Sequence, residues 1–307
     1  MDRNEESVRP PEIAVHTWLE PVLGGPGEKI SRIKAAGVTA IEAGYPVFVS
    51  QPEKVVASNC RFLQDAGIRL WAVHAPFGEA FDLSDPHDAA RRRAVEYHKF
   101  VLSRVALGNG SLMVIHPGSG GPSVDGNLAF TLLMASLEEL VPTAEQLRVQ
   151  LAIENLAYHT LGSDEVMLRR VVEEIDSPWL GVCFDTGHAH LAAGVMRTLE
   201  VLRDLIITFH LADNDGTRDL HLQPPYGTIP WKEFSAVFWE MGFDKPVVVE
   251  ARPWGEAGYA QQIREVGAVL EGGLLTLDVA GRSVRAQCLQ CGHYCFGDPD
   301  DPWCACP

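Results

Sequence analysis

Eight short apolar runs alternate along the chain with longer amphipathic segments, and this alternation limits the possible folds more than any other feature. The apolar runs are rich in Val, Ile and Leu, which is typical of parallel strands that are buried on both faces. They cover residues 13–18, 38–44, 68–74, 111–116, 149–155, 180–185, 205–210 and 246–251. The segments with helical spacing cover residues 27–36, 52–66, 87–107, 127–147, 163–175, 194–203, 231–241 and 257–271.

The unbroken series of eight βα units predicts an α/β fold, a single (β/α)8 TIM barrel. A doubly wound open sheet is the alternative, but no G-x-G-x-x-G turn follows the first strand. The chain has 307 residues, 46% of them hydrophobic, which is enough for one such core. Because the pattern stops near residue 272, we predict a barrel domain over 1–272 and a short Cys-rich extension over 273–307.

The overall charge restricts the classes of binding partner. A formal net charge of −16 argues against a nucleic-acid or membrane-surface protein, because both need a basic face. The N-terminal segment MDRNEESVRPPE lacks the apolar stretch of a signal peptide, and no apolar run reaches the roughly 18–20 residues that span a bilayer. We therefore expect a cytoplasmic enzyme for a small molecule. A homo-oligomer stays open, because no segment indicates an interface.

Six consecutive predicted strands end in residue types that bind metals. These strand-end residues are His74, His116, Glu154, Asp185, His210 and Glu250, and Glu42 lies near the end of the second strand. The carboxyl ends of the strands form the functional face of such a barrel. One buried histidine or carboxylate is commonly paired for structural reasons, but six in register would repel or stay desolvated without a cation. The pattern predicts a site for a divalent metal: Mn²⁺, Mg²⁺, Co²⁺ or Zn²⁺.

Two predicted loops add further candidate ligands. The segment DTGHAH places His188 just after the sixth strand, and HLADNDGTRDLHL follows the seventh strand. Asp219 and His221 alternate in that second segment, so an extended backbone would put both side chains on one side. Asp213 is a further acidic residue there, whereas Asp215, within the sequence NDG, is interpreted as a turn residue.

The motifs VHAPF, IHPG, IEN, CFDTGHA, FHLADNDGTRDLH and VVVEA resemble the xylose isomerase-like barrel superfamily from residue 13 to about residue 271. That superfamily contains sugar phosphate isomerases and epimerases, inosose dehydratase-like enzymes and the endonuclease IV class of DNA-repair enzymes. In the isomerase branch, the resemblance implies four ligands for one divalent metal, Glu154, Asp185, His210 and Glu250. In the endonuclease branch it implies three zinc ions, held by His74, His116 and Glu154, by the same four ligands, and by His188, Asp219 and His221.

Charge in the eight predicted loops that follow the strands favours the isomerase branch. The basic residues there are Arg218 and Arg252, too few to neutralise the phosphates of duplex DNA. The acidic residues are Glu20, Glu79, Asp82, Asp85, Asp88, Asp125, Asp213, Asp215, Asp219 and Glu256. We therefore expect a divalent-metal-dependent isomerase or epimerase of a sugar, sugar phosphate or inositol-like polyol. The alternative is an endonuclease IV-like zinc phosphodiesterase acting on abasic DNA.

The expected reaction is a proton transfer through a metal-bound enediolate. Glu154 and Glu250 would act as base and acid on opposite sides of the substrate, and His188 would hydrogen-bond the developing oxyanion. The intact Glu154 and Glu250 pair argues against a third reading, a barrel that only binds a sugar.

Several other residues are candidates for substrate contacts. His74 and His116 are expected to bind substrate if they hold no metal, and Arg252 is either a substrate contact or part of a rim salt bridge. Four aromatic residues near strand ends are candidates either for a pocket wall or for core packing: Trp18, Phe77, Trp231 and Trp254.

Most of the seven cysteines crowd into the last twenty residues. Two pairs there, Cys288 with Cys291 and Cys304 with Cys306, have spacing that favours a separate structural zinc site. A disordered tail and redox-active or disulfide-bonded cysteines are the alternatives. The preceding segment, 273–286, is compatible with a short hairpin.

Overall fold

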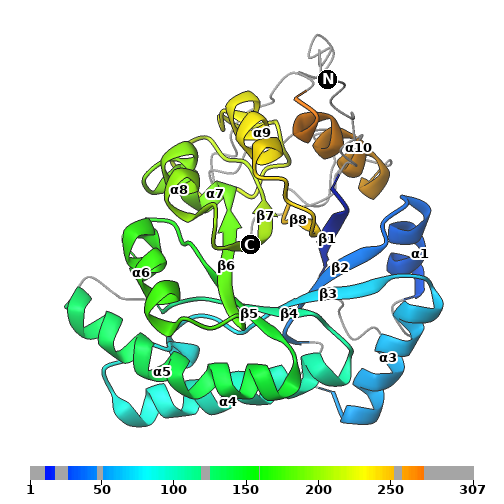
Figure 1. The fold of residues 1–307 in the computed structure, drawn as a ribbon. Coiled ribbons are helices and arrows are strands. Elements are labelled where there is room, and N and C mark those ends of the chain that lie inside the picture. The colour runs from blue at the N-terminus through cyan, green and yellow to red at the C-terminus, as the bar shows by residue number, and fades with distance from the viewer. Residues whose placement is uncertain are drawn as a thin grey trace, which may run out of the picture.

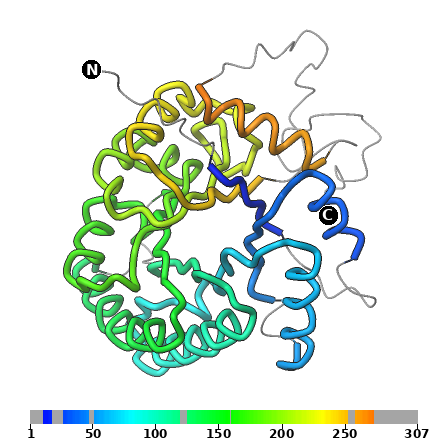
Figure 2. The backbone as a smooth tube through the Cα atoms, turned by 45° about the vertical axis from the view of Figure 1, so that its right-hand side comes forward, coloured from blue at the N-terminus to red at the C-terminus, as the bar shows by residue number. Residues whose placement is uncertain are grey.

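The computed structural model describes residues 11–17, 27–46, 51–118, 125–158, 160–251 and 258–272. Within this part of the chain, eight parallel strands form a closed barrel in sequence order. The ring closes where β1 pairs with β8, in the register of Ile13 with Val247 and Val15 with Val249. Helices surround the strands, as Figures 1 and 2 show. The predicted single (β/α)8 barrel is confirmed.

Every predicted strand and helix is present, with its ends within two residues of the prediction. The strands are β1 Ile13–Thr17, β2 Ala40–Gly44, β3 Arg69–His74, β4 Leu112–Ile115, β5 Gln150–Glu154, β6 Leu180–Asp185, β7 Ile206–Leu211 and β8 Val247–Val249. The helices are α1 Gly27–Ala35, α3 Glu53–Asp65, α4 Asp88–Leu107, α5 Gly126–Leu147, α6 Glu165–Ile175, α7 Thr186–Leu191, α8 Val195–Leu202, α9 Trp231–Glu240 and α10 Gly258–Leu270. Two short 3-10 helices cover Glu79–Phe81 and Leu161–Ser163.

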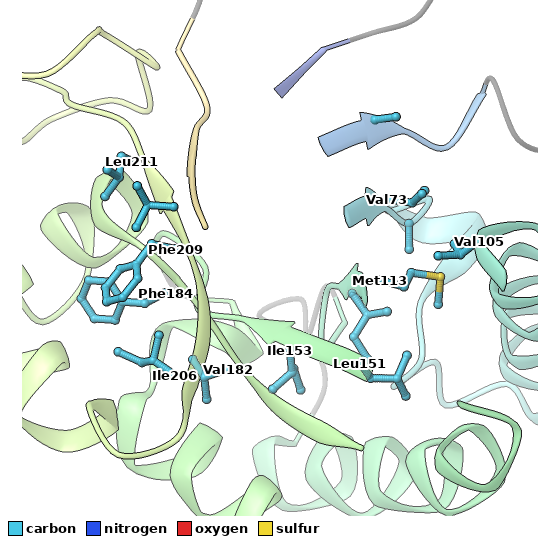
Figure 3. Close-up of a cluster of buried hydrophobic side chains, with 14 of the residues drawn as sticks. Val73, Val105, Met113, Leu151, Ile153, Val182, Phe184, Ile206, Phe209 and Leu211 are labelled. Atoms are coloured by element: carbon cyan, nitrogen blue, oxygen red, sulfur yellow. The ribbon is translucent and has the colours of Figure 1, made fainter. Parts of the chain in front are cut away.

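The strand side chains are divided between two hydrophobic clusters because successive residues point to opposite faces of the sheet. The larger cluster lies between the strands and the surrounding helices, where Phe184 and Phe209 pack with their rings 5.6 Å apart. Figure 3 shows part of this cluster, with Met113 of β4 beside Val105 of α4. The smaller cluster fills the barrel interior with mostly small side chains such as Ala72 and Ala152.

The segment after β6 differs from its prediction. The residues TGHAHL, expected as a loop, form the short helix α7. Asp185 at the end of β6 causes this, because its side chain caps the helix by accepting a hydrogen bond from the His188 N–H at 2.6 Å. The strand end therefore passes directly into a helix that projects its own side chains over the barrel mouth.

Two further expectations concern the extremes of the chain. The boundary near residue 272, the predicted hairpin and the four paired cysteines Cys288, Cys291, Cys304 and Cys306 fall at the edge of or outside the described residues. The separate zinc site in the tail stays a prediction. Among the described residues, no helix is long and apolar enough to cross a membrane.

Candidate metal centre

The barrel brings all nine predicted ligands together at the carboxyl ends of the strands. They form three groups, and within each group the ligand atoms lie within 4.8 Å of one another. The groups are His74, His116 and Glu154; Glu154, Asp185, His210 and Glu250; and His188, Asp219 and His221. The strand ends deliver most of these residues directly, whereas His188 comes from α7 and the Asp219–His221 pair from the loop after β7.

Glu154 belongs to two of the groups because its two oxygens face different ligands. Its Oε2 atom lies 3.0 Å from His116 Nε2 and 3.3 Å from His74 Nε2. Its Oε1 atom lies 3.0 Å from His210 Nδ1 and 3.5 Å from His188 Nδ1. Burial opposes ionisation of this carboxyl, but the surrounding imidazoles outweigh burial and hold its pKa well below its ordinary value.

Three buried carboxylate oxygens, one facing the first group and two in the second, show that the residues fit a cation. Glu154 Oε2, Asp185 Oδ2 and Glu250 Oε2 accept no hydrogen bond within the described part of the chain. Imidazole nitrogens lie 3.0 and 2.9 Å from the two glutamate oxygens, but no N–H is directed at them. A buried oxygen without a donor costs free energy, so converging lone pairs of this kind suit a divalent metal.

The pKa of Asp185 shows the same crowding of negative charge. Burial raises the pKa of this carboxyl to about 7, and the neighbouring carboxylates Glu154 and Glu250 add to the rise. The imidazoles of His188 and His210 oppose the rise without cancelling it. A divalent cation in this group would stabilise the ionised form of Asp185.

The third group contains the predicted Asp-x-His pair. Asp219 Oδ2 lies 3.1 Å from His221 Nε2 and 3.4 Å from His188 Nε2, so the two residues of the pair do face one site. The expected extended backbone is wrong, since His221 has a φ of 45°. The orientation of the His221 ring is set instead by a hydrogen bond. Its Nδ1 lies 2.8 Å from the carbonyl oxygen of Glu250 and is placed to donate to it.

Asn155, which the sequence interpretation passed over, holds the second and third groups in place. Its side chain accepts a hydrogen bond from the Asp185 N–H at 2.8 Å and donates one to the Asp185 carbonyl at 2.9 Å. Its own carbonyl lies 3.1 Å from His188 Nδ1. An amide directly after Glu154, in the IEN motif, is the only sequence signal for this role.

Tyr158 was also missed, and it connects the β5 loop with the β7 loop. It has a φ of 58°, and its hydroxyl accepts a hydrogen bond from the Asp219 N–H at 3.1 Å. Nothing in the local sequence indicates this contact, because the two residues lie far apart along the chain.

The remaining predicted residues have different outcomes. Phe77 is 47% exposed, and its ring stacks on His116 at 4.9 Å, so it lies beside the metal-binding groups. Trp231 is buried and donates to Asp213 at 2.7 Å, which makes both of them supports of the loop after β7. Asp215 accepts hydrogen bonds from Thr217 and Arg218, which confirms its interpretation as a turn residue.

Three further candidates, Trp18, Arg252 and Trp254, lie outside the described residues, so their roles stay predictions.

The mouth of the barrel is less acidic than the count of loop residues indicated. Asp82 is buried and accepts from Ser84, and Asp88 pairs with two arginines of α4. Asp213 is buried as well. In the described parts of these loops, Arg218 is nevertheless the single arginine or lysine, so the basic lining that duplex DNA requires is absent there.

Comparison with known proteins places this geometry in a family. The sequence model of the xylose isomerase-like TIM barrel family matches residues 30–267. The chain belongs to this family. The resemblance predicted from the strand-end motifs is thereby confirmed.

The proteins of similar sequence have mixed descriptions. An uncharacterized protein of Methanocaldococcus jannaschii is 29% identical over 199 residues, which cover 62% of this chain and 67% of that protein. A probable endonuclease 4 of Acholeplasma laidlawii is 29% identical over 159 residues, about half of each chain (50% and 51%).

Similar solved structures share the fold at lower identity. A D-tagatose 3-epimerase-like protein has a TM-score of 0.74 and 23% identity, covering 85% of this chain and 98% of its own. The IOLI protein with a bound zinc atom has a TM-score of 0.70 and 16% identity, with coverage of 85% and 98%.

Proposed function

We propose that this barrel is a divalent-metal-dependent isomerase or epimerase of a sugar or a related polyol. The observation that carries the proposal is that two carboxylates lie against the same ring nitrogen of one imidazole. His210 Nδ1 lies 3.0 Å from Glu154 Oε1 and 2.9 Å from Glu250 Oε2. Two carboxylates that flank one metal position can exchange a proton with a small substrate from two directions.

The second group of ligands, Glu154, Asp185, His210 and Glu250, would hold the catalytic metal. When bound there, the metal would polarise adjacent carbonyl and hydroxyl oxygens of the substrate and lower the pKa of the C–H bond between them. The mixed oxygen and nitrogen ligands are compatible with Mn²⁺, Co²⁺ or Zn²⁺. They suit Mg²⁺ less well, because Mg²⁺ prefers oxygen ligands.

The two glutamates differ in exposure, and this difference assigns their roles. The Glu250 side chain is 15% exposed, whereas that of Glu154 is 1% exposed. We assign Glu250 as the base that removes the proton from the substrate carbon, leaving the electron pair in an enediolate. Glu154 would supply a proton to carbon, either on the opposite face or at the neighbouring position. Because its low pKa leaves it ionised, it would first take that proton from water, while Glu250 releases the abstracted proton to water.

His188 is the candidate for orienting the substrate oxygen. Its Nδ1 is held by the Asn155 carbonyl at 3.1 Å, so its Nε2 is directed to the side of Asp219 at 3.4 Å. Burial lowers the pKa of His188, but Asp185, Asp219 and Glu154 outweigh burial and hold it well above its ordinary value. In the resulting imidazolium form, Nε2 can donate a hydrogen bond to an oxygen that gains negative charge during proton transfer.

Deuterium exchange tests this proposal directly. The purified protein, loaded in turn with Mn²⁺, Co²⁺, Zn²⁺ and Mg²⁺, is incubated in deuterated water with a panel of ketoses, aldoses and inososes, free and phosphorylated. We expect proton NMR to show loss of the signal of a C–H adjacent to the carbonyl for at least one substrate, and Glu250→Gln to abolish it. Absence of exchange from the whole panel with a metal-loaded protein would contradict the proposal.

A second candidate function is hydrolysis of a phosphodiester, and one observation favours it. Glu154 directs one oxygen to each of two ligand groups, an arrangement that suits a carboxylate shared between two metals, and a third group lies beside them. The relatives described as probable endonuclease 4 add support for this chemistry.

The number of metals separates the two candidates. Elemental analysis after dialysis is expected to find about one divalent ion in the barrel for the isomerase, and about three zinc ions for the phosphodiesterase. Because the tail cysteines can bind zinc themselves, the count is made on a variant with Ser at Cys288, Cys291, Cys304 and Cys306. Cleavage of an abasic-site duplex or of bis-p-nitrophenyl phosphate, without any carbon-bound exchange, would establish the second candidate.

A further inference from the structure

The ring of ionisable residues in the barrel has two members for which no role has been described. His16 of β1 and Glu42 of β2 are register partners and point into the barrel together with His210 of β7. Glu42 is completely buried. Its Oε2 atom lies 3.0 Å from His210 Nε2, and its Oε1 atom lies 2.8 Å from His16 Nδ1. A buried chain of hydrogen bonds therefore runs from β1 through β2 to β7.

The partners of Glu42 set it apart from an ordinary buried carboxylate. Among the described residues, no lysine or arginine forms an ion pair with it, and its two hydrogen-bond partners are imidazoles. Glu265, another buried carboxylate, is instead held by the neutral donors Gln223, Tyr226 and Gln261, and it joins α10 to the β7 loop. A change at Glu265 therefore serves as the control for a change at Glu42, because Glu265 is also a buried carboxylate but contacts no ligand histidine among the described residues.

Glu42 determines which ring nitrogen of His210 is available as a ligand. A carboxylate only accepts hydrogen bonds, so its contact with Nε2 places a proton on that nitrogen. The opposite nitrogen, Nδ1, is the one that lies 3.0 Å from Glu154, 2.9 Å from Glu250 and 3.9 Å from Asp185. Nδ1 is then left as the lone-pair donor directed toward a metal, and the negative charge of Glu42 makes it more basic.

We propose that Glu42 is a positioning residue for the metal centre, which holds His210 in the orientation and tautomer that a metal requires, and that His16 in turn holds Glu42. This inference rests on the metal centre of the proposed function. It does not depend on which of the two candidate reactions the centre catalyses, because His210 belongs to the same ligand group in both.

Metal affinity and the cobalt spectrum test this role without an activity assay. Dissociation constants for Zn²⁺ and Co²⁺ are measured by chelator competition for the wild type, Glu42→Gln and Glu265→Gln. These measurements use the full chain with the four tail cysteines replaced by Ser. We expect Glu42→Gln to weaken binding by about 10–100-fold and to change the visible absorption of the Co²⁺ form. A carboxylate that is hydrogen-bonded to a ligand histidine fixes the orientation of that histidine and makes it more basic. Glu265→Gln is expected to keep both the wild-type affinity and the wild-type spectrum.

Replacement of His16 gives a second, independent measurement. The side-chain amide of His16→Asn can replace the Nδ1 donor to Glu42, whereas His16→Leu removes that donor. We expect His16→Asn to bind Co²⁺ more tightly than His16→Leu. If Glu42→Gln fails to fold, as judged by circular dichroism, the ratio between these two His16 variants decides the question.

The outcomes distinguish this inference from the proposed function. A wild-type affinity and spectrum in Glu42→Gln, or equal affinities in the two His16 variants, would overturn the positioning role and leave the metal centre in place. A wild-type protein that binds no divalent ion in the barrel would overturn the proposed function, and the positioning role with it.

Discussion

The barrel interior contains two layers of opposite chemistry on the same strands. In the lower layer, the side chains are mostly small and apolar, with Ala14, Ala40, Ala72, Val114, Ala152, Cys183, Thr208 and Val248 among the buried residues. Two residues further along each strand, the upper layer consists of His16, Glu42, His74, His116, Glu154, Asp185, His210 and Glu250. The spacing of two is the period at which strand side chains return to the same face. Every strand therefore contributes one small residue to the floor and one ionisable residue to the centre.

The difference between the layers explains how so many ionisable groups are held together. The lower layer offers the centre few competing donors and a low-dielectric surrounding, in which interactions between charges are stronger than in water. Its small side chains also fit the narrow interior of an eight-stranded barrel. The upper layer is thus supported by a floor of mostly small, buried side chains.

The largest effect is expected from a change in the upper layer at Glu154, the residue that belongs to two ligand groups. Glu154→Gln removes a carboxylate that faces two ligand groups, so we expect kcat/KM to fall by at least about 10³-fold. Steady-state kinetics with the substrate found by deuterium exchange provides the measurement. Asp215→Asn, which changes a turn residue outside the ligand groups, serves as the control and should stay within a few-fold of wild type. Comparable losses in both variants would show that the effect is not specific to the centre.

A smaller effect is expected from the lower layer, and it should appear in stability alone. Leu112 is buried in the barrel floor, so Leu112→Ala is expected to lower the free energy of unfolding by about 3 kcal/mol through lost packing. Urea denaturation in excess chelator measures this. Leu128, which is 47% exposed, provides the matched control, for which the change to Ala should cost much less. If Leu112→Ala also reduces the metal affinity of the folded protein, the two layers are not independent.

The smallest of the three effects is expected from a buried histidine outside the centre. It follows from a comparison of His74, which lies beside a carboxylate, with His98, which has no carboxylate beside it among the described residues. His74 is buried beside Glu154, and although burial lowers its pKa, that carboxylate outweighs burial and raises the pKa to about 9. His98 of α4 is equally buried, but no described carboxylate pairs with it, and burial lowers its pKa to about 4. Its only hydrogen bond in the described structure joins Nδ1 to the Ala94 carbonyl at 2.8 Å.

The depressed pKa of His98 predicts a loss of stability in acid. The native state keeps this imidazole neutral, so its contribution is complete above the ordinary pKa of 6.5 and is lost as the pH falls toward 4. Between pH 7.5 and pH 5 the wild type should lose roughly 2 kcal/mol through this group, and His98→Leu should lose that much less. Urea denaturation of the metal-free protein at the two pH values measures the difference. A His98→Leu variant that kept the wild-type pH dependence would contradict the assignment.

Much of the centre could be read from the sequence because strand ends are local features. An apolar run that stops at His74, Glu154 or Asp185 marks both the strand and the residue at its carboxyl end. His16 was missed because it lies inside the run IAVHTW, where one polar residue resembles an ordinary interruption. Glu42 was noticed near its strand end but was given no role, because its partner His210 is far away in the sequence.

The sequence by itself determined the eight strands, their order and the residues that line the mouth, because hydrophobic periodicity and strand-end chemistry act over a few residues. Only the tertiary structure decided how those residues are grouped. The sharing of Glu154 between two groups, the cap by which Asp185 starts α7, and the hydrogen bonds from Glu42 to His16 and His210 depend on closure of the barrel. Closure sets distances between residues far apart in the chain, and spacing along a strand specifies the face on which a side chain lies but not its partner across the barrel.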